Sequence, residues 1–298
     1  MNSGYVVLAE RGLIGLRGDD ARGLLQGVIS TDIERVTPAS ASYGALLTPQ
    51  GKYLFDFVIM QVGDALLLDT ERARAGDLMR RLMMYRLRAK VEIEDRSDEL
   101  EVAAVLGDDL ATRLGLPAQP GAARPLKDGI VLIDPRLAQL GGRAVLPRTQ
   151  TAVALEEAGF AALPQAAYEQ ARLALGVPDG SRDLVVDRST LLEAGFEELH
   201  GVDFKKGCFV GQELTARMKY RGLVRKRLMP VAFEGPAPAP GTPIRLDGKD
   251  AGEMRSGQDG HGMALLRLEQ VARAAEGGLP LLADATVVIP HKPDWAQF

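Results

Sequence analysis

Residues 206–213 read Lys-Gly-Cys-Phe-Val-Gly-Gln-Glu, and this octapeptide is the most distinctive stretch of the 298-residue chain. Cys208, the only cysteine, stands between two glycines, and Gln212 opens a stretch that favours a helix. Lys205, Lys206 and the positive end of that helix would favour the thiolate form of the cysteine. We interpret Cys208 as a partly accessible functional thiol; the alternative is a buried, inert cysteine, the commonest fate of this residue type.

A basic tract follows the octapeptide, with six Lys or Arg and no acidic residue in eleven positions. Its members are Arg217, Lys219, Arg221, Arg225, Lys226 and Arg227. The tract is typical of a solvated helix face or of a site for carboxylates, phosphates or RNA backbone, and its place beside Cys208 favours an anion site. A second basic cluster precedes the acidic residues 92–99, so we predict a salt-bridged helix surface there. Its members are Arg80, Arg81, Arg86, Arg88 and Lys90.

The overall composition excludes several classes of protein. With 36 Lys and Arg against 40 Asp and Glu, the net charge of −4 excludes a bulk nucleic-acid coat or a membrane-covering polycation. No uninterrupted apolar stretch approaches the ~20 residues of a spanning helix, and the N-terminus does not resemble a signal peptide. One cysteine forms no internal disulfide and, with three scattered histidines, no autonomous metal site. We therefore expect a cytoplasmic protein with no stably bound metal and no membrane partner.

Apolar runs and turn signals predict two α+β units followed by a β-rich unit. Residues 5–8 and 13–16 are apolar runs around a charged turn, which predicts a hairpin. Gly-Asp-Asp at residues 18–20 recurs at residues 107–109, each time between a strand end and an amphipathic helix, which indicates a duplicated α+β unit. After Gly222, short apolar segments alternate with Gly and Pro turns, as in a small β-barrel or sandwich.

The octapeptide resembles the K-G-C-[FY]-x-G-Q-E signature of the YgfZ family, tetrahydrofolate-binding proteins related to the aminomethyltransferase (T-protein) of the glycine cleavage system. The mitochondrial members of that family are iron–sulfur cluster assembly factors. Residues 25–32, Leu-Gln-Gly-Val-Ile-Ser-Thr-Asp, are similar to an early stretch of the family. Residues 43–56, which contain Leu-Leu-Thr-Pro-Gln-Gly-Lys, are similar to its second hairpin. Residues 85–95 and 172–178 also match in order.

The resemblance implies a fold and a division into domains. The fold would be an α+β, aminomethyltransferase-like ring of two folate-binding α+β domains and a C-terminal β-barrel around a central folate cavity. Residues 1–95 with part of 160–222 would form the first α+β domain. Residues 96–160 would form the second α+β domain, and residues 223–298 would form the barrel.

The same resemblance assigns candidate site residues. Tyr168 falls where one branch of the family has an aromatic side chain that stacks on folate, whereas the partner aromatic position falls at Arg11. The T-protein has two adjacent acids near its second hairpin, but this chain has only Asp56, followed by Phe57. The missing acid removes a group for proton transfer on an amine substrate, which weakens a glycine-cleavage interpretation. Glu193 keeps its place within a loop that otherwise departs from the family.

The candidate residues fall into two sets. The signature set contains Lys206, Gly207, Cys208, Phe209, Gly211, Gln212 and Glu213, with Cys208 as the functional thiol. The folate-binding set contains Tyr168, Glu193, Arg217, Arg221 and Asp56. The basic tract would hold the glutamate tail of folate or an acidic surface of a partner protein.

Three functions stay open at this point. The leading hypothesis is a tetrahydrofolate-binding accessory protein for iron–sulfur cluster assembly or repair, which supports [4Fe–4S] enzymes, including those that modify tRNA. Its partners would be folate, iron–sulfur assembly proteins and client enzymes, with tRNA met only indirectly. One thiol is enough for transient ligation or redox exchange but not for a permanent cluster. The alternatives are a folate-dependent aminomethyltransferase or demethylase, and direct tRNA binding by residues 217–227.

Overall fold

Apolar strands of residues 11–95 form the first sheet of the protein, whose computed structural model describes residues 3–298. The sheet is antiparallel, with the strand order β3-β4-β5-β2-β6. The strands are β2 (Arg11–Arg17), β3 (Ser42–Leu47), β4 (Tyr53–Val62), β5 (Ala65–Glu71) and β6 (Glu92–Asp95). Helices α1 (Ala21–Val28) and α2 (Ala75–Arg86) cover one face through buried leucines such as Leu25 and Leu78.

The second sheet combines residues 100–162 with the N-terminal strand, in the order β11-β1-β7-β10-β9-β8. Its strands are β1 (Gly4–Val7), β7 (Leu100–Leu106), β8 (Ala123–Leu126), β9 (Gly129–Ile133), β10 (Gly142–Pro147) and β11 (Ala161–Ala162). The predicted hairpin of residues 5–8 and 13–16 is wrong, because β1 pairs with β7 while β2 pairs with β5 and β6. Residues 11–95 are therefore an insertion between two neighbouring strands of the second sheet.

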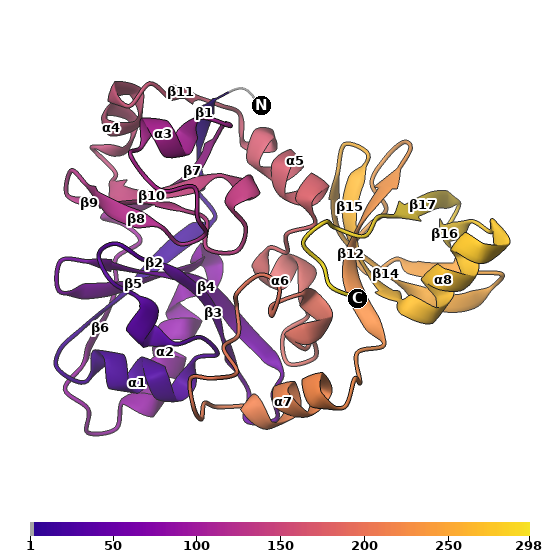
Figure 1. Cartoon of the computed structure of the whole chain (residues 1–298), viewed down its shortest axis with the longest axis horizontal. Helices are drawn as coiled ribbons and strands as arrows, with labels where there is room; N and C mark the ends of the chain where they lie inside the picture. The colour runs from indigo at the N-terminus through magenta and orange to yellow at the C-terminus, as the bar shows by residue number, and fades with distance from the viewer. Residues whose placement is uncertain (1–2) are drawn as a thin grey trace.

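The two sheets pack face to face, so the chain up to residue 162 has four layers (Figure 1). Along β4, Val58 and Met60 enter the core between the sheets, whereas Phe57 and Ile59 pack under α1 and α2. This alternation is the period-2 pattern of a strand that is buried on both faces. Helices α3 (Leu110–Arg113) and α4 (Thr151–Glu157) cover the outer face of the second sheet.

The two Gly-Asp-Asp stretches mark equivalent turns from a strand into a helix, before α1 and before α3. Gly18 and Gly107 have φ values of +114° and +133°, which glycine adopts without a steric penalty. The expected side-chain caps are absent at both Asp20 and Asp109. The Asp20 carboxylate instead accepts a hydrogen bond from the backbone N–H of Lys90 at 2.8 Å.

Residues 163–222 connect the two-sheet part to the barrel, and Figure 1 shows α5 and α6 between these two parts. The helices of this segment are α5 (Gln165–Leu175), α6 (Gly180–Asp183) and α7 (Gln212–Tyr220). Short 3₁₀ helices lie at Ile33–Arg35, Arg72–Arg74, Ala138–Leu140 and Leu192–Ala194. None of the helices within residues 3–298 is long and apolar enough to cross a membrane.

The Gly/Pro-punctuated C-terminal segments form a closed six-stranded barrel in the order β12-β15-β14-β13-β16-β17. The strands are β12 (Lys226–Phe233), β13 (Pro243–Leu246), β14 (Lys249–Gln258), β15 (His261–Arg267), β16 (Leu281–Ala283) and β17 (Thr286–Pro290). Helix α8 (Leu268–Gly277) follows β15, and Ala274 of this helix is buried in the barrel's own core. The predicted barrel is thus confirmed, with a separate core of its own.

A buried polar cluster fastens the barrel to the rest of the molecule. Arg172 of α5 is fully buried and contacts Asp183 of α6 at 2.9 Å and the Ser256 hydroxyl of β14 at 2.9 Å. Ser256 in turn donates its hydroxyl proton to Asp183 at 2.5 Å. Near the C-terminus, the Trp295 indole N–H donates to the Leu175 carbonyl at 2.7 Å. Both contacts involve α5, so this helix is one of the elements that hold the barrel in place.

Candidate functional site

The octapeptide loop is held against residues 25–32, a stretch far away in the sequence. The Val210 backbone N–H donates to the Gly27 carbonyl at 3.3 Å, and the Asp203 N–H donates to the Ser30 carbonyl at 2.9 Å. The buried Ser30 hydroxyl donates to the Gly201 carbonyl at 2.6 Å. Two of these bonds join backbone groups and the third comes from a buried side chain, so together they define the path of the chain into the loop.

A second side of the loop packs against the turn between β3 and β4. Gly211 has a φ of +81°, and a Cβ atom there would lie 2.4 Å from the Thr48 carbonyl oxygen. Gly51 has a φ of +79°, and its Cβ would lie 2.8 Å from the Gly211 carbonyl oxygen. Only glycine satisfies both the backbone conformation and this close approach. Three of the five stretches that carry the sequence resemblance, residues 25–32, 43–56 and 206–213, therefore meet in one place.

Lys206 points into this junction and away from solvent. Its ammonium donates to the carbonyls of Gln26 at 2.8 Å and Ile29 at 2.5 Å, at the C-terminal end of α1. It also lies 5.2 Å from the centre of the Phe209 ring. Burial lowers the pKa of Lys206 to about 8, although Asp32 and Asp203 oppose the shift. The lysine therefore stabilises the loop through these carbonyls, and its influence on the thiol stays a prediction.

Cys208 is exposed, in the loop that precedes α7. Gly207 has a φ of +96° and open space around its Cβ position, so its conformation alone requires glycine. Gln212, the first residue of α7, accepts a hydrogen bond from the Phe209 N–H at 3.3 Å, and Phe209 itself is buried. The loop therefore buries its aromatic residue and presents its thiol to solvent.

The basic tract after the loop is partly neutralised. Arg217 pairs with Glu213, and Lys219 pairs with Glu197. Arg227 pairs with Glu198 at 2.9 Å and lies over the Phe298 ring. Arg221, Arg225 and Lys226 make no ion pair within residues 3–298. The tract thus keeps three free cations rather than six, because folding brings carboxylates from elsewhere to it.

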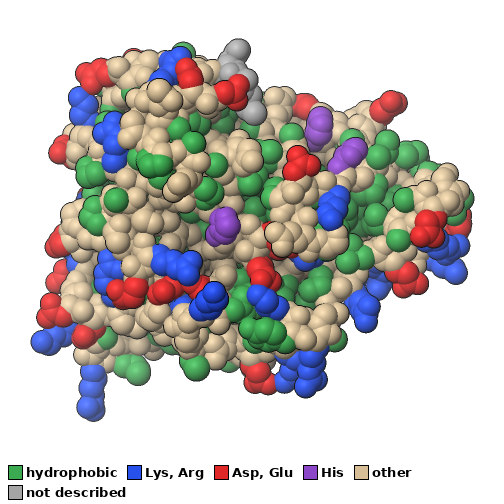
Figure 2. Space-filling view, in the orientation of Figure 1, with side chains coloured by type: hydrophobic (Ala, Val, Ile, Leu, Met, Phe, Trp, Pro, Cys, Tyr) green, Lys and Arg blue, Asp and Glu red, His purple; other side chains and the backbone are tan. Residues whose placement is uncertain are grey.

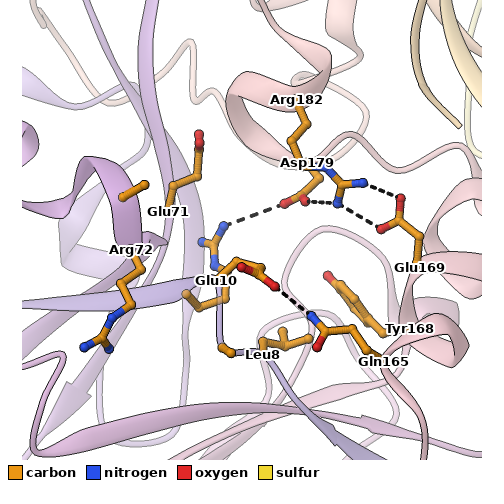
Figure 3. Close-up of a pocket in the computed structure, with 12 residues that line it drawn as sticks. Leu8, Glu10, Glu71, Arg72, Gln165, Tyr168, Glu169, Asp179 and Arg182 are labelled. Atoms are coloured by element: carbon orange, nitrogen blue, oxygen red, sulfur yellow. Dashed lines mark hydrogen bonds and ion pairs between the residues drawn. The ribbon is translucent and has the colours of Figure 1, made fainter. Parts of the chain in front are cut away.

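A cavity of about 530 Å³ opens between the two-sheet part and helices α5 and α6 (Figure 3). Its lining residues are Leu8, Ala9, Glu10, Arg11, Glu71, Arg72, Ala73, Gln165, Tyr168, Glu169, Asp179 and Arg182. Four of them carry carboxylates and three carry guanidinium groups. Across the wall of the cavity, Glu10 accepts a hydrogen bond from Gln165 at 3.0 Å, and Glu169 accepts one from Arg182 at 2.7 Å (Figure 3). The volume lies within the range of small-molecule sites.

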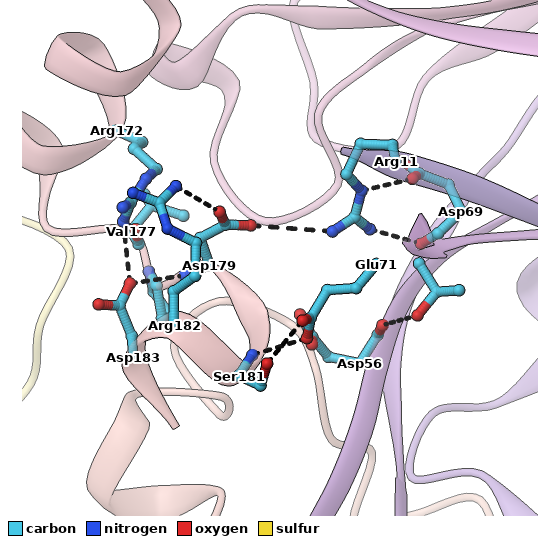
Figure 4. A network of polar contacts seen from close by, with 12 residues as sticks. Arg11, Asp56, Asp69, Glu71, Arg172, Val177, Asp179, Ser181, Arg182 and Asp183 are labelled. Carbon is cyan, nitrogen blue, oxygen red and sulfur yellow. Dashed lines mark hydrogen bonds and ion pairs between the residues drawn. The ribbon is translucent and has the colours of Figure 1, made fainter. Parts of the chain in front are cut away.

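Arg11 lines this cavity from the start of β2. Its guanidinium lies 2.7 Å from the Asp69 carboxylate and 3.8 Å from Asp179 (Figure 4). Burial alone would lower the pKa of Arg11, but these carboxylates raise it above its ordinary value. Burial would likewise raise the pKa of Asp179, yet Arg172 and Arg11 lower it to about 2. A permanent positive charge therefore stands at the position that the resemblance aligns with an aromatic residue.

Two buried arginines hold the Tyr168 side chain in place. Arg136 and Arg143 donate to the Tyr168 hydroxyl at 3.1 and 3.0 Å. Asp134 accepts from Arg136 at 2.8 Å and from Arg143 at 3.1 Å, and Arg143 also pairs with Asp69. Burial would raise the pKa of Asp134, but the two guanidinium groups lower it overall. The tyrosine ring thus lines the cavity while its hydroxyl is fully occupied.

No motif of the sequence predicts this arginine pair or its two carboxylates. They come from the end of β5, from the residues that follow β9 and from β10, and β5 is far from the other two in the chain. The available signal is weak: Asp69 and Asp134 each end an apolar strand run, and Arg143 interrupts one. A charged residue in a strand that is buried on both faces indicates a partner on a neighbouring strand.

Asp56 is buried in the middle of β4 and accepts two hydrogen bonds. The Tyr43 hydroxyl donates to it at 2.8 Å and the Tyr53 hydroxyl at 2.7 Å. Burial raises the pKa of this carboxyl, although the charge of Arg11 and the two hydroxyl groups act in the opposite direction. Asp56 is not among the residues that line the cavity. It therefore orders the structure near the cavity instead of facing it.

The predicted folate-binding set is divided by the structure. Tyr168 lines the cavity. Asp56 does not line it but interacts electrostatically with Arg11, which does. Glu193 accepts from the Thr190 hydroxyl at 2.8 Å and does not line the cavity. Arg217 and Arg221 do not line it either, because α7 directs both side chains toward solvent. Within residues 3–298, no group of three or more His, Cys, Asp or Glu is arranged to hold a metal ion.

The barrel and the whole chain are similar to known proteins. Residues 225–298 match the family model described as "CAF17, C-terminal beta-barrel domain". "Iron-sulfur cluster assembly factor IBA57, mitochondrial" from Homo sapiens is 33% identical over 316 residues, covering 96% of this chain and 83% of the human protein. Its Mus musculus counterpart is 32% identical over 96% of this chain and 83% of its own length. The Mycosarcoma maydis homologue is 32% identical over 89% of this chain and 74% of its own length.

One solved structure agrees over nearly the whole length. The glycine cleavage system aminomethyltransferase T from Bartonella henselae matches with a TM-score of 0.77, covering 99% of this chain and 86% of that chain. The two sequences are 17% identical, so the similarity concerns the fold. The predicted aminomethyltransferase-like fold is thereby confirmed.

The expectation of a cytoplasmic protein is wrong, because the similar curated proteins are named as mitochondrial. The expectation rested on the single cysteine. A lone cysteine argues only against an oxidising compartment. It therefore does not separate the cytoplasm from the interior of a mitochondrion.

Proposed function

The chain belongs to the IBA57 family of iron–sulfur cluster assembly factors, and we propose that it is a tetrahydrofolate-binding accessory protein for the assembly or repair of iron–sulfur clusters. Its clients would be [4Fe–4S] enzymes, among them enzymes that modify tRNA. Its partners would be the iron–sulfur assembly proteins that deliver or receive a cluster. The cluster is cargo in this proposal and not a resident cofactor.

The exposed thiol of Cys208 carries the proposal. It stands on a loop that is fixed by the Lys206 ammonium, by the close approach of Gly211 and by backbone bonds to residues 25–32. A solvent-exposed thiolate can attack a disulfide or ligate iron transiently, whereas a permanent cluster needs about four protein ligands. The fixed loop supplies one ligand at a defined place and leaves the others to the partner.

The cavity residues fit a reduced folate. The volume of about 530 Å³ suits a drug-sized ligand, and the Tyr168 ring offers an aromatic surface. Lining carboxylates such as Glu10 and Glu71 can accept hydrogen bonds from the amino and ring N–H groups of a pterin. The Arg11 guanidinium is planar and can stack on an aromatic ring, so it replaces the aromatic partner of Tyr168. When bound, the folate would supply a carrier for one-carbon units.

A complementation experiment tests the role of the thiol. In cells that lack the native protein, Cys208→Ser should reduce the activity of [4Fe–4S] enzymes at least tenfold relative to the unaltered chain. The variant should fold normally, because an exposed substitution away from special features changes stability by less than about 0.5 kcal/mol. Lys249→Gln, a change at an exposed lysine of the barrel, serves as the control and should keep activity. A stable Cys208→Ser protein with full activity would remove the thiol from the mechanism.

Thermal unfolding tests folate binding. Saturating 5-formyltetrahydrofolate should raise the melting temperature, since a ligand at 100 times its Kd stabilises the folded state by about 2.7 kcal/mol. Ala73→Trp places a large ring at the cavity wall and should abolish the rise. Ala152→Trp, at an exposed position on α4, should keep it. An unchanged melting temperature of the unaltered chain would contradict the folate part of the proposal and leave the thiol part standing.

The two alternative functions have less support. An aminomethyltransferase or demethylase needs an acid that reaches its substrate, but Asp56 is buried and bonded to two tyrosines. Direct tRNA binding by residues 217–227 would rest on only three free cations. Turnover of an aminomethyl donor by the purified protein with tetrahydrofolate would favour the first alternative. Salt-dependent tRNA binding would favour the second.

A further inference from the structure

The outer face of the last two turns of α2 carries large apolar side chains that nothing covers. Met83, Met84 and Leu87 are 44%, 66% and 88% exposed, and Leu87 is the most exposed large hydrophobic residue within residues 3–298. Together with Arg80 they have the i, i+3, i+4, i+7 spacing of one helix face. The opposite face, with Leu78 and Leu82, is fully buried against the first sheet. The helix therefore has two apolar faces, of which only one is used by the fold.

The backbone at Leu87 is unusual for a side chain of this kind. Leu87 follows the last residue of α2 with a φ of 45° and a ψ of −108°, a conformation that favours glycine. A leucine here costs stability and exposes its whole side chain to water. Strain of this sort persists where a function requires it. Leu87 is thus unfavourable both for its backbone conformation and for the exposure of its side chain.

The basic residues around this apolar face lack acidic partners. Arg81, Arg86, Arg88 and Lys90 make no side-chain ion pair within residues 3–298, and Arg80 pairs only with Asp77 of its own helix. The acidic residues that follow pair elsewhere, Asp98 with Arg72 and Glu99 with Arg96. The predicted salt-bridged surface is therefore wrong, because the turn after α2 directs these arginines outward and away from residues 92–99.

We propose that this surface, the α2 ridge (Arg80, Met83, Met84, Arg86, Leu87 and Arg88), docks an acidic amphipathic helix of a partner protein. The arginines without acidic partners make the surface electrostatically complementary to carboxylates, and the apolar spacing matches a helix that lies alongside α2. Met and Arg are the residues enriched in protein–protein interfaces, and Met adapts its shape to a partner. A membrane-surface helix would instead carry Trp, Phe and Leu, and the ridge has neither Trp nor Phe.

The ridge is separate from the two places discussed above. It shares no residue with the cavity lining or with the octapeptide loop. In Figure 1, α2 lies on the side of the molecule opposite the barrel, and Figure 2 shows long basic side chains projecting from the corresponding edge. A partner held there would leave both the cavity and the exposed thiol accessible. The docking proposal therefore stands independently of folate binding and of the thiol chemistry.

Fluorescence anisotropy with designed peptides tests the ridge. The first probe is a helical peptide of about 18 residues with Leu at i, i+3, i+4 and i+7 and Glu on both flanks, long enough to form a helix. The second has the same composition in scrambled order. The full chain should bind the first peptide at least tenfold more tightly than the second. A combined Met84→Ser and Leu87→Ser variant should remove this preference, and Arg86→Gln with Arg88→Gln should weaken binding of both peptides and flatten its salt dependence.

The controls separate docking from general stickiness. Val153→Ser, which removes another large exposed hydrophobic side chain, should leave both affinities unchanged. Equal affinity for the two peptides would mean attraction of charge alone and would overturn the proposal. Binding of the chain to vesicles of phosphatidylcholine and phosphatidylglycerol, lost in the Met84→Ser and Leu87→Ser variant, would also overturn it in favour of a lipid surface.

Discussion

The octapeptide loop and the wall of the central cavity are built in opposite ways. The loop consists of consecutive residues whose conformation is fixed by glycines and by backbone bonds, at Gly211 and Val210 for example. The cavity wall depends on charged side chains from strands that are far apart, such as Asp69, Asp134 and Arg143. A consecutive site leaves a motif in the sequence, and a site assembled from distant strands does not. We therefore expect substitutions in the two regions to reduce the stability of the protein for different reasons.

Breaking the arginine pair should have the largest effect. Arg143→Met breaks two buried ion pairs at once, because it removes one of the two cationic partners of both Asp69 and Asp134, and should cost about 3–5 kcal/mol of the free energy of unfolding. Urea unfolding measures this loss. Arg273→Met removes an exposed partner of Asp247 and should change stability by less than about 1 kcal/mol. Similar values for the two variants would show that the charges behind Tyr168 are not coupled as the contacts imply.

The loop should be nearly as sensitive at Gly211. Gly211→Ala adds a Cβ against the Thr48 carbonyl in a backbone conformation that L residues avoid, and should cost about 3 kcal/mol. Gly207→Ala meets the same backbone restriction without a neighbour and should cost about 1 kcal/mol. Urea unfolding of the pair separates close packing from backbone conformation. Equal costs would mean that the turn between β3 and β4 leaves room for a side chain at residue 211.

Removing one hydroxyl from the cavity wall should have an intermediate effect. Tyr168→Phe takes away the acceptor shared by Arg136 and Arg143 and should cost about 1–3 kcal/mol. The ring is kept, so a folate-induced rise in melting temperature should persist. Tyr85→Phe, at a hydroxyl without a partner within residues 3–298, should be neutral in the same thermal unfolding experiment. A neutral Tyr168→Phe would mean that the two arginines are satisfied by their carboxylates alone.

The smallest effect concerns the pH dependence of the loop. Lys206 has a pKa of about 8 in the folded protein against its ordinary value of 10.5, because burial opposes its charge. Between these values the unfolded chain binds more protons, so the contribution of Lys206 to stability rises with pH. The stability of the unaltered chain relative to Lys206→Met should therefore increase between pH 8 and pH 10, by less than about 1 kcal/mol after solvent screening. A constant difference would mean that the two carbonyl bonds keep the ammonium charged.

The sequence predicted the fold and the loop better than the cavity. The strand and turn patterns and the octapeptide signature led to two α+β units and a barrel, which the structure confirms. The N-terminal hairpin was predicted wrongly because local spacing does not tell which of several sheets a strand enters. Pairing of β1 with β7 depends on the packing of the whole second sheet, and no local signal encodes it.

The exposure of a candidate residue could be predicted best where its cause is local. The exposure of Cys208 follows from its glycines and from a buried Phe209, all within a few residues. Arg217 and Arg221 were assigned to folate from charge alone, but the direction of a side chain depends on which face of α7 packs. Met218 is buried on that helix, so the basic residues face solvent. Charge identifies a polar face of a helix without telling what that face meets.

The central position of β1 has a consequence for how the chain is made. Residues Gly4–Val7 are synthesised well before their partner strand β7, which begins at Leu100. At a synthesis rate of 5–20 residues per second, the strand waits about 5 to 20 seconds for that partner. During this time the inserted sheet of residues 11–95 can already fold, while β1 presents unpaired backbone groups that other chains can capture. Strand β1 is thus exposed to wrong pairing during synthesis, although in the folded protein it lies between β11 and β7.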